Sequence, residues 1–345
     1  MRHGEWRERE TGLGPAAYIP SRKPLKIAFH LPAWLSYFIS LSKIAAIYLK
    51  AKSSGLMKDW QEFQNQYCAQ PYVPEIARRA EDSILALCDE WPRGAVPGPL
   101  DGKPRAACLL AGVDTQKSHF RWIFRAFGFG RAEESWLVAA GSAGSFEALD
   151  QILWQSEWTD AEGRSYQVRA AMIDAMGSRT SEVYRYAIAN RGRVFPWQGV
   201  RSAVQPYTPS PQEYFPDDRG GKIRIPGGIN LWRCDTTFFK NDLAHKLSIH
   251  PDDPGAFHLH SNEKNELEEY AREMCAEVFD EEKLTWENPG KKANHFWDCE
   301  VMALALAYIM NVRATAPEQP KPARRRTEKL RGRDSLEARL GRLPR

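Results

Sequence analysis

Three aspartates stand at positions where an ionised carboxylate is costly unless it has a partner. Asp114 ends the apolar run CLLAGVD, Asp174 ends the run AAMID, and Asp298 lies in an apolar segment with Val301 and Ala305. A charge at the edge of a core is expensive unless it is paired or bound to a metal. Carboxylates that hold two divalent cations about 3.5–4 Å apart can hydrolyse a phosphodiester, and hard cations prefer oxygen ligands. We therefore expect Asp114, Asp174 and Asp298 to be catalytic residues and the ligands of two Mg²⁺ or Mn²⁺ ions, with Asp114 bridging both.

Each aspartate by itself has a simpler explanation, because a strand-end aspartate commonly caps a turn or a helix. The prediction depends on all three meeting at one point. His295 lies three residues before Asp298, on nearly the same helix face, so it either orients a water on the metal or is a satisfied core histidine. Glu133 and Glu134 are candidates for a fourth ligand, or solvated glutamates at a strand edge.

Several cations lie close to these aspartates in the sequence and are candidate nucleic-acid contacts. Lys117, Arg121 and Arg179 are predicted to contact phosphates. Lys240 follows Asp235 in RCDTTFFK and is predicted to contact a phosphate or to form a surface salt bridge. The basic tail adds Arg324, Arg325 and Arg326, which we expect to bind DNA without sequence preference and to lose that binding as salt rises.

The aspartates must be positioned by strands and helices, and the apolar patterns predict these. Strands are expected at 107–114, 120–130, 134–141, 168–174 and 193–197, and helices at 145–156, with Ser145 as a cap, and at 180–190. Three adjacent strands followed by helix, strand, helix and strand indicate an α/β fold with a mixed five-stranded sheet flanked by helices, in the order of the RNase H-like fold. In that order the first and fourth strands are neighbours, and their aspartates share one edge.

The rest of the chain is expected to complete this domain. The Pro-, Gly- and Asp-rich segment 206–228 predicts a loop, and a short strand is expected at 229–234. Helices are predicted at 237–247, 263–279 and 294–311, with another strand at 256–260. Residues 1–98 are predicted to form a polar N-terminus and a helical segment, 99–312 the RNase H-like domain, and 313–345 a basic disordered tail.

Composition limits the class of protein further. The chain has 345 residues and a net charge of +4, but residues 313–345 hold eleven Lys and Arg against four Asp and Glu, so the rest carries −3. A DNA-binding groove in that part must therefore be local. No run of eighteen apolar residues and no apolar leader occur, so we expect neither a membrane span nor a secreted protein. Six scattered cysteines without a CxxC pair suit reduced thiols in a cytoplasm.

The motifs that carry the aspartates resemble those of one family. LLAGVDTQ (109–116), EESW (133–136), MIDAMGSRTSEVYRY (172–186) and NHFWDCEVMALALA (294–307) are similar to the C-terminal nuclease domain of the lambda-type (GpA-like) terminase large subunits. Segments 28–52 and 61–72 resemble the part that joins motor and nuclease in that family, so the resemblance covers residues 20–312. The GxxxxGK[ST] loop of the motor does not occur in this sequence, so we expect no ATPase site in this chain.

The resemblance implies a metal-dependent endonuclease that cleaves double-stranded viral DNA during genome packaging. It also implies a small terminase subunit and a portal or procapsid as partners, in the cytoplasm of the host cell. Two alternatives remain open: a catalytically silent scaffold that binds DNA or portal, and another RNase H-like nuclease of the resolvase or transposase type.

Overall fold

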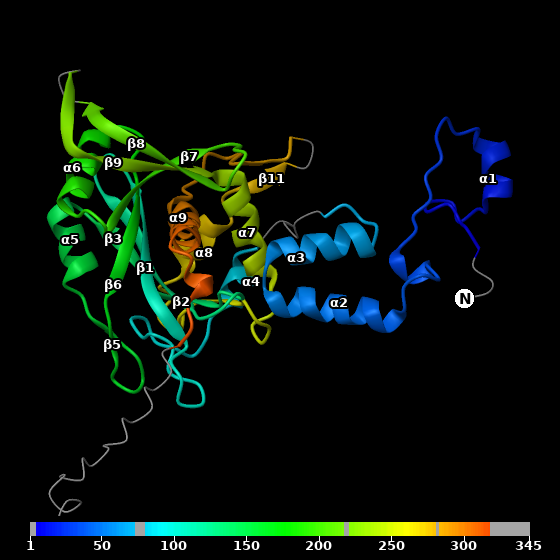
Figure 1. Ribbon diagram of the computed structural model, residues 1–345, viewed down its shortest axis with the longest axis horizontal. Helices are drawn as coiled ribbons and strands as arrows, with labels where there is room; N and C mark the ends of the chain where they lie inside the picture. Colours follow the sequence, from blue (N-terminus) through cyan, green and yellow to red (C-terminus); the bar gives the residue numbers. More distant parts are fainter. Residues whose placement is uncertain (1–4, 73–79, 217–220, 281–282, 318–345) are drawn as a thin grey trace, which may run out of the picture.

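A single large sheet organises the chain in the computed structural model, which describes residues 5–72, 80–216, 221–280 and 283–317 (Figure 1). Its eight strands within these residues run in the order β10-β3-β2-β1-β6-β7-β9-β8. Strand β1 is antiparallel to β2 and parallel to β6, which in turn is parallel to β7. The strands of this sheet are β1 (Ala106–Thr115), β2 (Phe120–Gly128), β3 (Ser135–Ala143), β6 (Val168–Asp174), β7 (Val194–Val200), β8 (Tyr207–Pro216), β9 (Lys222–Asp235) and β10 (Phe257–His258).

Helices cover both faces of the sheet. The longer helices are α2 (Leu41–Ser54), α5 (Phe146–Trp154), α6 (Thr180–Ala189), α7 (Thr236–Ser248) and α9 (His295–Ile309). Shorter elements are α1 (Pro15–Arg22), α3 (Met57–Glu62), α4 (Glu81–Leu85), α8 (Glu268–Met274), the 3-10 turns η1 (Ala33–Leu35) and η3 (Val312–Ala314), and the π-helical turn η2 (Phe63–Tyr67). Two small hairpins, β4 (Trp158–Thr159) with β5 (Ser165–Tyr166) and β11 (Val278–Asp280) with β12 (Thr285–Glu287), complete the described elements.

Successive side chains of β1 pack in two different core layers, one on each face of the sheet. Leu110 packs in a cluster with residues of α7, α8 and α9, whereas Leu109 and Ala111 pack in a second cluster with residues of α5 and α6. Successive side chains of a strand point to opposite faces. From Cys108 onward, the even-numbered residues of β1 therefore face α9. This helix is buried on nearly all sides, as expected for an element in the middle of a core.

The strands predicted for the first half of the sheet are confirmed. Their order, β3-β2-β1-β6-β7, contains the mixed arrangement expected from the sequence, and Ser145 caps α5 through a hydrogen bond from the Ala148 amide. The sheet is larger than the five strands expected. The additional strands are β10 at one edge, and β9 and β8 at the other.

The expected loop at 206–228 is wrong, because β8 and β9 form a long antiparallel pair there. The prolines of this segment favoured a loop over a strand in the sequence analysis. Strand β8 lies at the sheet edge, and Pro209 and Pro211 sit in it opposite Trp232 and Asn230. Proline is tolerated in edge strands, since its missing amide hydrogen need not serve a neighbour on the outer side.

The expected helix at 263–279 is also too long, because only Glu268–Met274 forms α8. The chain after it becomes extended and enters the hairpin of β11 and β12. Glu277 therefore lies in the extended segment after α8, and its side chain is buried.

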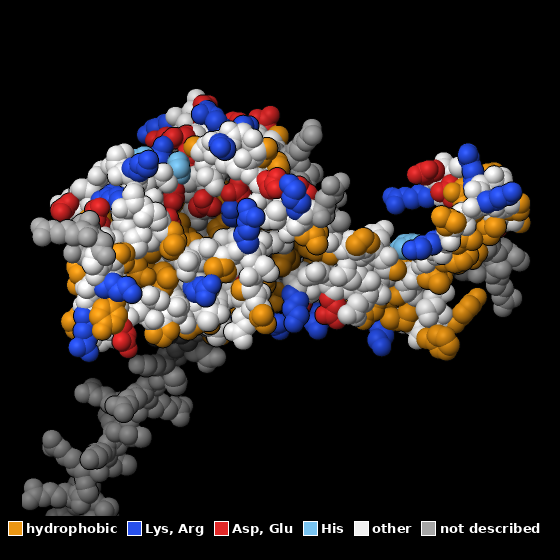
Figure 2. Space-filling view, turned by 90° about the horizontal axis from the view of Figure 1, so that it is seen from above, with side chains coloured by type: hydrophobic (Ala, Val, Ile, Leu, Met, Phe, Trp, Pro, Cys, Tyr) orange, Lys and Arg blue, Asp and Glu red, His pale blue; other side chains and the backbone are white. Residues whose placement is uncertain are grey.

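Residues 5–72 form an N-terminal arm that projects from the sheet domain and meets it near α7 (Figure 1). The arm has a small core of its own, made of Ile44, Ala51, Phe63 and Cys68. Hydrophobic side chains gather on its surface (Figure 2), among them the fully exposed Leu25 and Phe38. A cavity of about 620 Å³, lined by residues of the arm and of α7, lies where the two parts meet.

The segment that follows the arm packs against the sheet domain. Ile84 and Val96 are buried in its two core clusters, and Cys88 makes a bridge to Leu259. The domain boundary expected at residue 99 stays a prediction. Within the described residues, no helix has the length and apolar character needed to cross a membrane.

Candidate active site

Two of the three aspartates lie side by side because of strand register. Val113 of β1 pairs with Ile173 of β6 in a parallel ladder, and the next residues are Asp114 and Asp174. Neighbouring strands are about 4.8 Å apart. Asp114 shares its face with Leu110, and Asp174 shares its face with Met172, and both of these belong to the cluster packed against α9. The two carboxylates therefore end adjacent strands on the side covered by α9.

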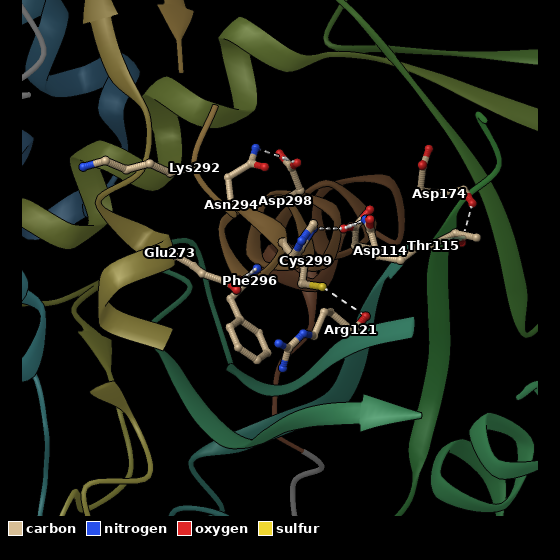
Figure 3. A network of polar contacts seen from close by, with 12 residues as sticks. Asp114, Thr115, Arg121, Asp174, Glu273, Lys292, Asn294, Phe296, Asp298 and Cys299 are labelled. Carbon is tan, nitrogen blue, oxygen red and sulfur yellow. Dashed lines mark hydrogen bonds and ion pairs between the residues drawn. The ribbon is translucent and has the colours of Figure 1, made fainter. Parts of the chain in front are cut away.

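The third aspartate comes from α9, which crosses β1 at very close range. A Cβ atom on Gly112 would lie 1.9 Å from the carbonyl oxygen of Cys299, so only glycine permits this approach. Asp298, next to Cys299, is thereby brought to the ends of β1 and β6. Figure 3 shows Asp114 between Asp298 and Asp174. The three aspartates thus lie at the same end of β1 and β6, and their role as metal ligands stays a prediction.

Each carboxylate is held by neighbouring donors. Asp114 Oδ2 accepts a hydrogen bond from Gln116 Nε2 at 2.6 Å and lies 2.7 Å from His295 Nδ1. The backbone amide of Met176 donates to Asp174 Oδ1 at 3.1 Å, as in a turn cap. His295 is thus a partner of the site rather than a histidine satisfied elsewhere in the core.

Asp298 is held on both oxygens. Asn294 Nδ2 donates to Oδ2 at 2.9 Å, and Lys240 Nζ lies 3.5 Å from Oδ1. Glu277 binds the same two donors: Lys240 lies at 2.7 Å and Asn294 at 2.8 Å. The carboxylates of Glu277 and Asp298 are therefore joined by one ammonium and one amide.

Burial and the charges of neighbouring carboxylates raise the pKa of Asp174 and of Asp298. Burial raises the pKa of Asp174 to about 7, and the charges of Asp114 and Asp298 add to the effect. Burial also raises the pKa of Asp298 to about 7, with help from Glu277 and Asp114 and against the opposing charge of Lys240. The hydrogen bond to Asp114 raises the pKa of His295. The site is therefore rich in negative charge and short of compensating cations.

In the described ranges, no three His, Cys, Asp or Glu side chains already form an arrangement that could hold a metal ion. Carboxylates repel one another without a cation between them. Here Asp114 and Asp298 are instead hydrogen-bonded to His295, Gln116, Asn294 and Lys240.

The cations expected to contact nucleic acid differ in their surroundings. Lys117 is exposed in the turn between β1 and β2. Arg121 forms an ion pair with Glu269 at 2.5 Å, and Arg179 one with Glu182 at 2.7 Å. Lys240 is largely buried and pairs with Glu277, so the ion-pair alternative is the one present, although the pair is not on the surface. Arg324, Arg325 and Arg326 lie outside the described residues.

The sequence analysis missed Glu277 and Asn294 as neighbours of Asp298, and the two glutamates that it offered as a fourth ligand, Glu133 and Glu134, precede β3 at the other end of the sheet. Glu134 pairs with Arg105 just before β3, at the end of the sheet where β1 begins, whereas Asp114 lies where β1 ends. The only sequence signal for Glu277 was its place between apolar neighbours in MCAEVF.

Comparison with known proteins gives a consistent result. The family described as terminase large subunit gpA, endonuclease domain, matches residues 26–319. The chain is also similar to the terminase large subunit of Escherichia phage lambda, with 25% identity over 304 residues. This alignment covers 83% of the chain and 44% of the lambda protein, so the chain spans less than half the length of that relative. No solved structure matches.

Proposed function

Because this chain belongs to the endonuclease-domain family of the gpA terminase large subunits, we propose that it is the metal-dependent nuclease that cuts double-stranded viral DNA during packaging. One observation carries the proposal: Asp114 and Asp174 end adjacent parallel strands in register, and Asp298 is brought to them by α9. The five strands β3-β2-β1-β6-β7 have the order of an RNase H-like core. We therefore propose that the domain has an RNase H-like fold.

The chemistry of these donors suits a pair of Mg²⁺ or Mn²⁺ ions, although the side chains do not already form a metal-binding arrangement in the described ranges. All donors are carboxylate oxygens, which these hard cations prefer. Partial burial beside other carboxylates raises the pKa of two of the carboxyl groups to about 7, and a divalent cation would compensate the charge that these groups carry when they ionise. Asp114, Asp174 and Asp298 would hold the ions. When bound, the ions would supply Lewis acidity toward the scissile phosphate and lower the pKa of water.

The side chains around the aspartates have separable tasks. His295 and Gln116 both bind Oδ2 of Asp114, which fixes the carboxylate, and among the described residues Oδ1 makes no hydrogen bond. The Met176 amide fixes Asp174 in the same way through Oδ1. Lys117, exposed beyond the end of β1, can attract a DNA backbone to the site.

The partners and the setting of the reaction are proposed from the family. They are double-stranded DNA, a small terminase subunit and a portal or procapsid, in the cytoplasm of the host cell. The 345 residues contain no GxxxxGK[ST] sequence, so we expect no ATP hydrolysis from them.

The experiment is a nicking assay on supercoiled plasmid with Mn²⁺ or Mg²⁺, compared with the same reaction in EDTA. Asp114→Ala, Asp174→Ala and Asp298→Ala should each abolish metal-dependent cleavage and leave the thermal midpoint within a few degrees. Intact plasmid with the unmodified chain would favour a silent scaffold. Full activity in Asp114→Ala would remove the assigned site. A strong preference for a branched junction over plasmid would favour a resolvase-type nuclease.

A further inference from the structure

Four side chains close a ring beside the active-site carboxylates. Glu277 Oε1 accepts a hydrogen bond from Lys240 at 2.8 Å and from Asn294 at 2.8 Å, and Glu277 Oε2 lies 2.7 Å from Lys240. The same ammonium and the same amide then meet the two oxygens of Asp298, at 3.5 Å and 2.9 Å. Figure 3 shows the Asn294 amide directed at Asp298. We call these four residues the Asp298 ring.

The ring joins three parts of the fold. Lys240 comes from α7, Glu277 from the extended segment after α8, and Asn294 and Asp298 from the start of α9. Glu277 is 7% exposed, so its charge must be compensated inside the protein. Both carboxylate oxygens of Glu277 accept hydrogen bonds from Lys240, so the ammonium lies closer to Glu277 than to Asp298.

This unequal sharing has an electrostatic consequence. Lys240 and Glu277 together are neutral, so the lysine does not cancel the negative charge of the three aspartates. If Glu277 lost its charge, Asp298 would be the carboxylate left to pair with Lys240. A tight Lys240–Asp298 pair would compete with any divalent cation for Asp298.

We propose that Glu277 is a positioning residue for the metal centre. It keeps Lys240 away from Asp298 and presents Asn294 to the opposite oxygen, so that Asp298 has a fixed orientation and remains available to a cation. Glu277 itself is not a ligand. This inference rests on the proposed function, since it assigns Glu277 a task toward the ions that Asp298 would hold.

The test measures binding of Mn²⁺ to the full chain by titration calorimetry, without DNA and without turnover. Glu277→Gln keeps the size of the side chain and removes its charge. We expect this change to weaken Mn²⁺ binding about 10- to 100-fold, the range for groups that orient metal ligands. The matched control is Glu287→Gln, which removes the same charge from an exposed ion pair with Lys283 and should leave the affinity unchanged.

A second variant separates positioning from ligation. In Lys240→Met/Glu277→Gln the competing ammonium is gone, so Mn²⁺ affinity should recover by at least tenfold relative to Glu277→Gln alone. If Glu277 were a ligand, the double variant would bind as weakly as the single one, and the inference would be overturned. Unchanged affinity in Glu277→Gln would overturn it as well.

Asn294→Ser provides the measurement if Glu277→Gln fails to fold. Serine retains a helix-capping hydroxyl but lacks the amide that meets Asp298 and Glu277, so Mn²⁺ affinity should fall while the thermal midpoint is kept. No fall in affinity would contradict the role of the ring. Failure of the proposed function has a different signature: the unmodified chain would then bind no Mn²⁺ and cut no plasmid. If Asp298→Asn abolished tight Mn²⁺ binding while Glu277→Gln left it unchanged, the proposed function would stand and only the inference about Glu277 would be contradicted.

Discussion

At the scale of single residues, the candidate site is a group of carboxylates that the fold has left partly uncompensated. Asp174 and Asp298 both have a pKa raised to about 7, mainly by burial. Buried carboxylates in a purely structural role are normally paired with enough hydrogen-bond donors to offset that cost. The raised pKa values of these two carboxyl groups make the stability of the metal-free protein sensitive to pH near neutrality.

Asp174→Asn should stabilise the metal-free protein, and more so at pH 8 than at pH 5. The folded-state pKa of Asp174 lies above the unfolded value, so the native state binds more protons between these two values and its stability falls as pH rises toward 7. Asparagine cannot ionise, so the variant does not lose this stability as pH rises. The gain at pH 8 should be on the order of 2 kcal/mol, since a raised pKa converts at about 1.4 kcal/mol per unit and local relaxation reduces it. Urea unfolding in EDTA at both pH values measures the difference, and an equal gain at both would contradict the burial argument.

At the scale of elements, the site depends on the close contact between α9 and β1. Gly112 lies two residues before Asp114 and faces the backbone of α9 at Cys299. The helix is otherwise fixed by a buried ion pair, in which Arg125 of β2 binds Glu300 through two hydrogen bonds of 2.6 and 2.9 Å. The hydroxyl of Tyr270 donates to the same glutamate at 2.7 Å. These contacts set the height and rotation of the helix that carries Asp298.

Gly112→Ala should displace α9 and destabilise the protein by about 3 kcal/mol, the upper part of the usual range for overpacking a core. The new methyl group would meet backbone, which cannot move aside as a side chain can. Plasmid cleavage should be lost even below the unfolding temperature, because Asp298 moves with the helix. Gly144→Ala is the control, since nothing lies within 4 Å of its added Cβ. A Gly112→Ala protein with normal stability and activity would refute the contact.

A second element-scale feature is His258, which ties three segments together. Its Nδ1 lies 2.9 Å from Asp89, and its Nε2 lies 3.1 Å from Glu134, while its ring stacks on Trp136. Asp89 follows α4, Glu134 precedes β3, and His258 is in β10. Glu134 also pairs with Arg105. Burial works to lower the pKa of His258, but the hydrogen bonds to the two carboxylates outweigh it and raise that pKa.

The stabilisation from His258 should be present in mild acid and be lost in alkali. Since the folded-state pKa is raised, the contribution is complete below the ordinary value near 6.5 and disappears as pH rises through the folded-state value. His258→Asn should therefore lower the unfolding midpoint strongly at pH 5.5 and weakly at pH 9. A difference that grows with pH would show that the histidine is neutral in the folded protein.

At the scale of the whole molecule, the arm and the sheet domain have separate cores. The arm buries few residues, and a cavity separates part of it from α7. The sheet domain instead has two extensive core clusters, one on each face. Local opening is easiest where few apolar contacts are buried.

Amides of α2 and α3 should therefore exchange with solvent long before those of β1 and β6. Hydrogen exchange followed by mass spectrometry compares these segments directly. The strands should show protection close to the free energy of global unfolding, and the arm should show much less. Equal protection in α2 and β1 would indicate that the arm is part of one cooperative unit.

The sequence alone determined the central strands, the helices α5, α6, α7 and α9, and the positions of Asp114, Asp174 and Asp298. These features are local, because a continuous apolar run predicts a covered strand and an aspartate at its end is visible without knowing any neighbour. The resemblance to the terminase nucleases rested on the same runs and is confirmed by the family match. The metal ions and their two-ion arrangement stay a prediction.

Tertiary structure decided the partners of those aspartates and the extent of the sheet. The prolines of β8 predict a loop unless the edge position of the strand is known, and Glu277 lies within the helix predicted at 263–279, whereas α8 ends at Met274. Lys240, Glu277 and Asn294 meet Asp298 only because α7, α8 and α9 pack on one face of the sheet. Such contacts join residues dozens of positions apart, and no local periodicity reports which side chains will share a charge.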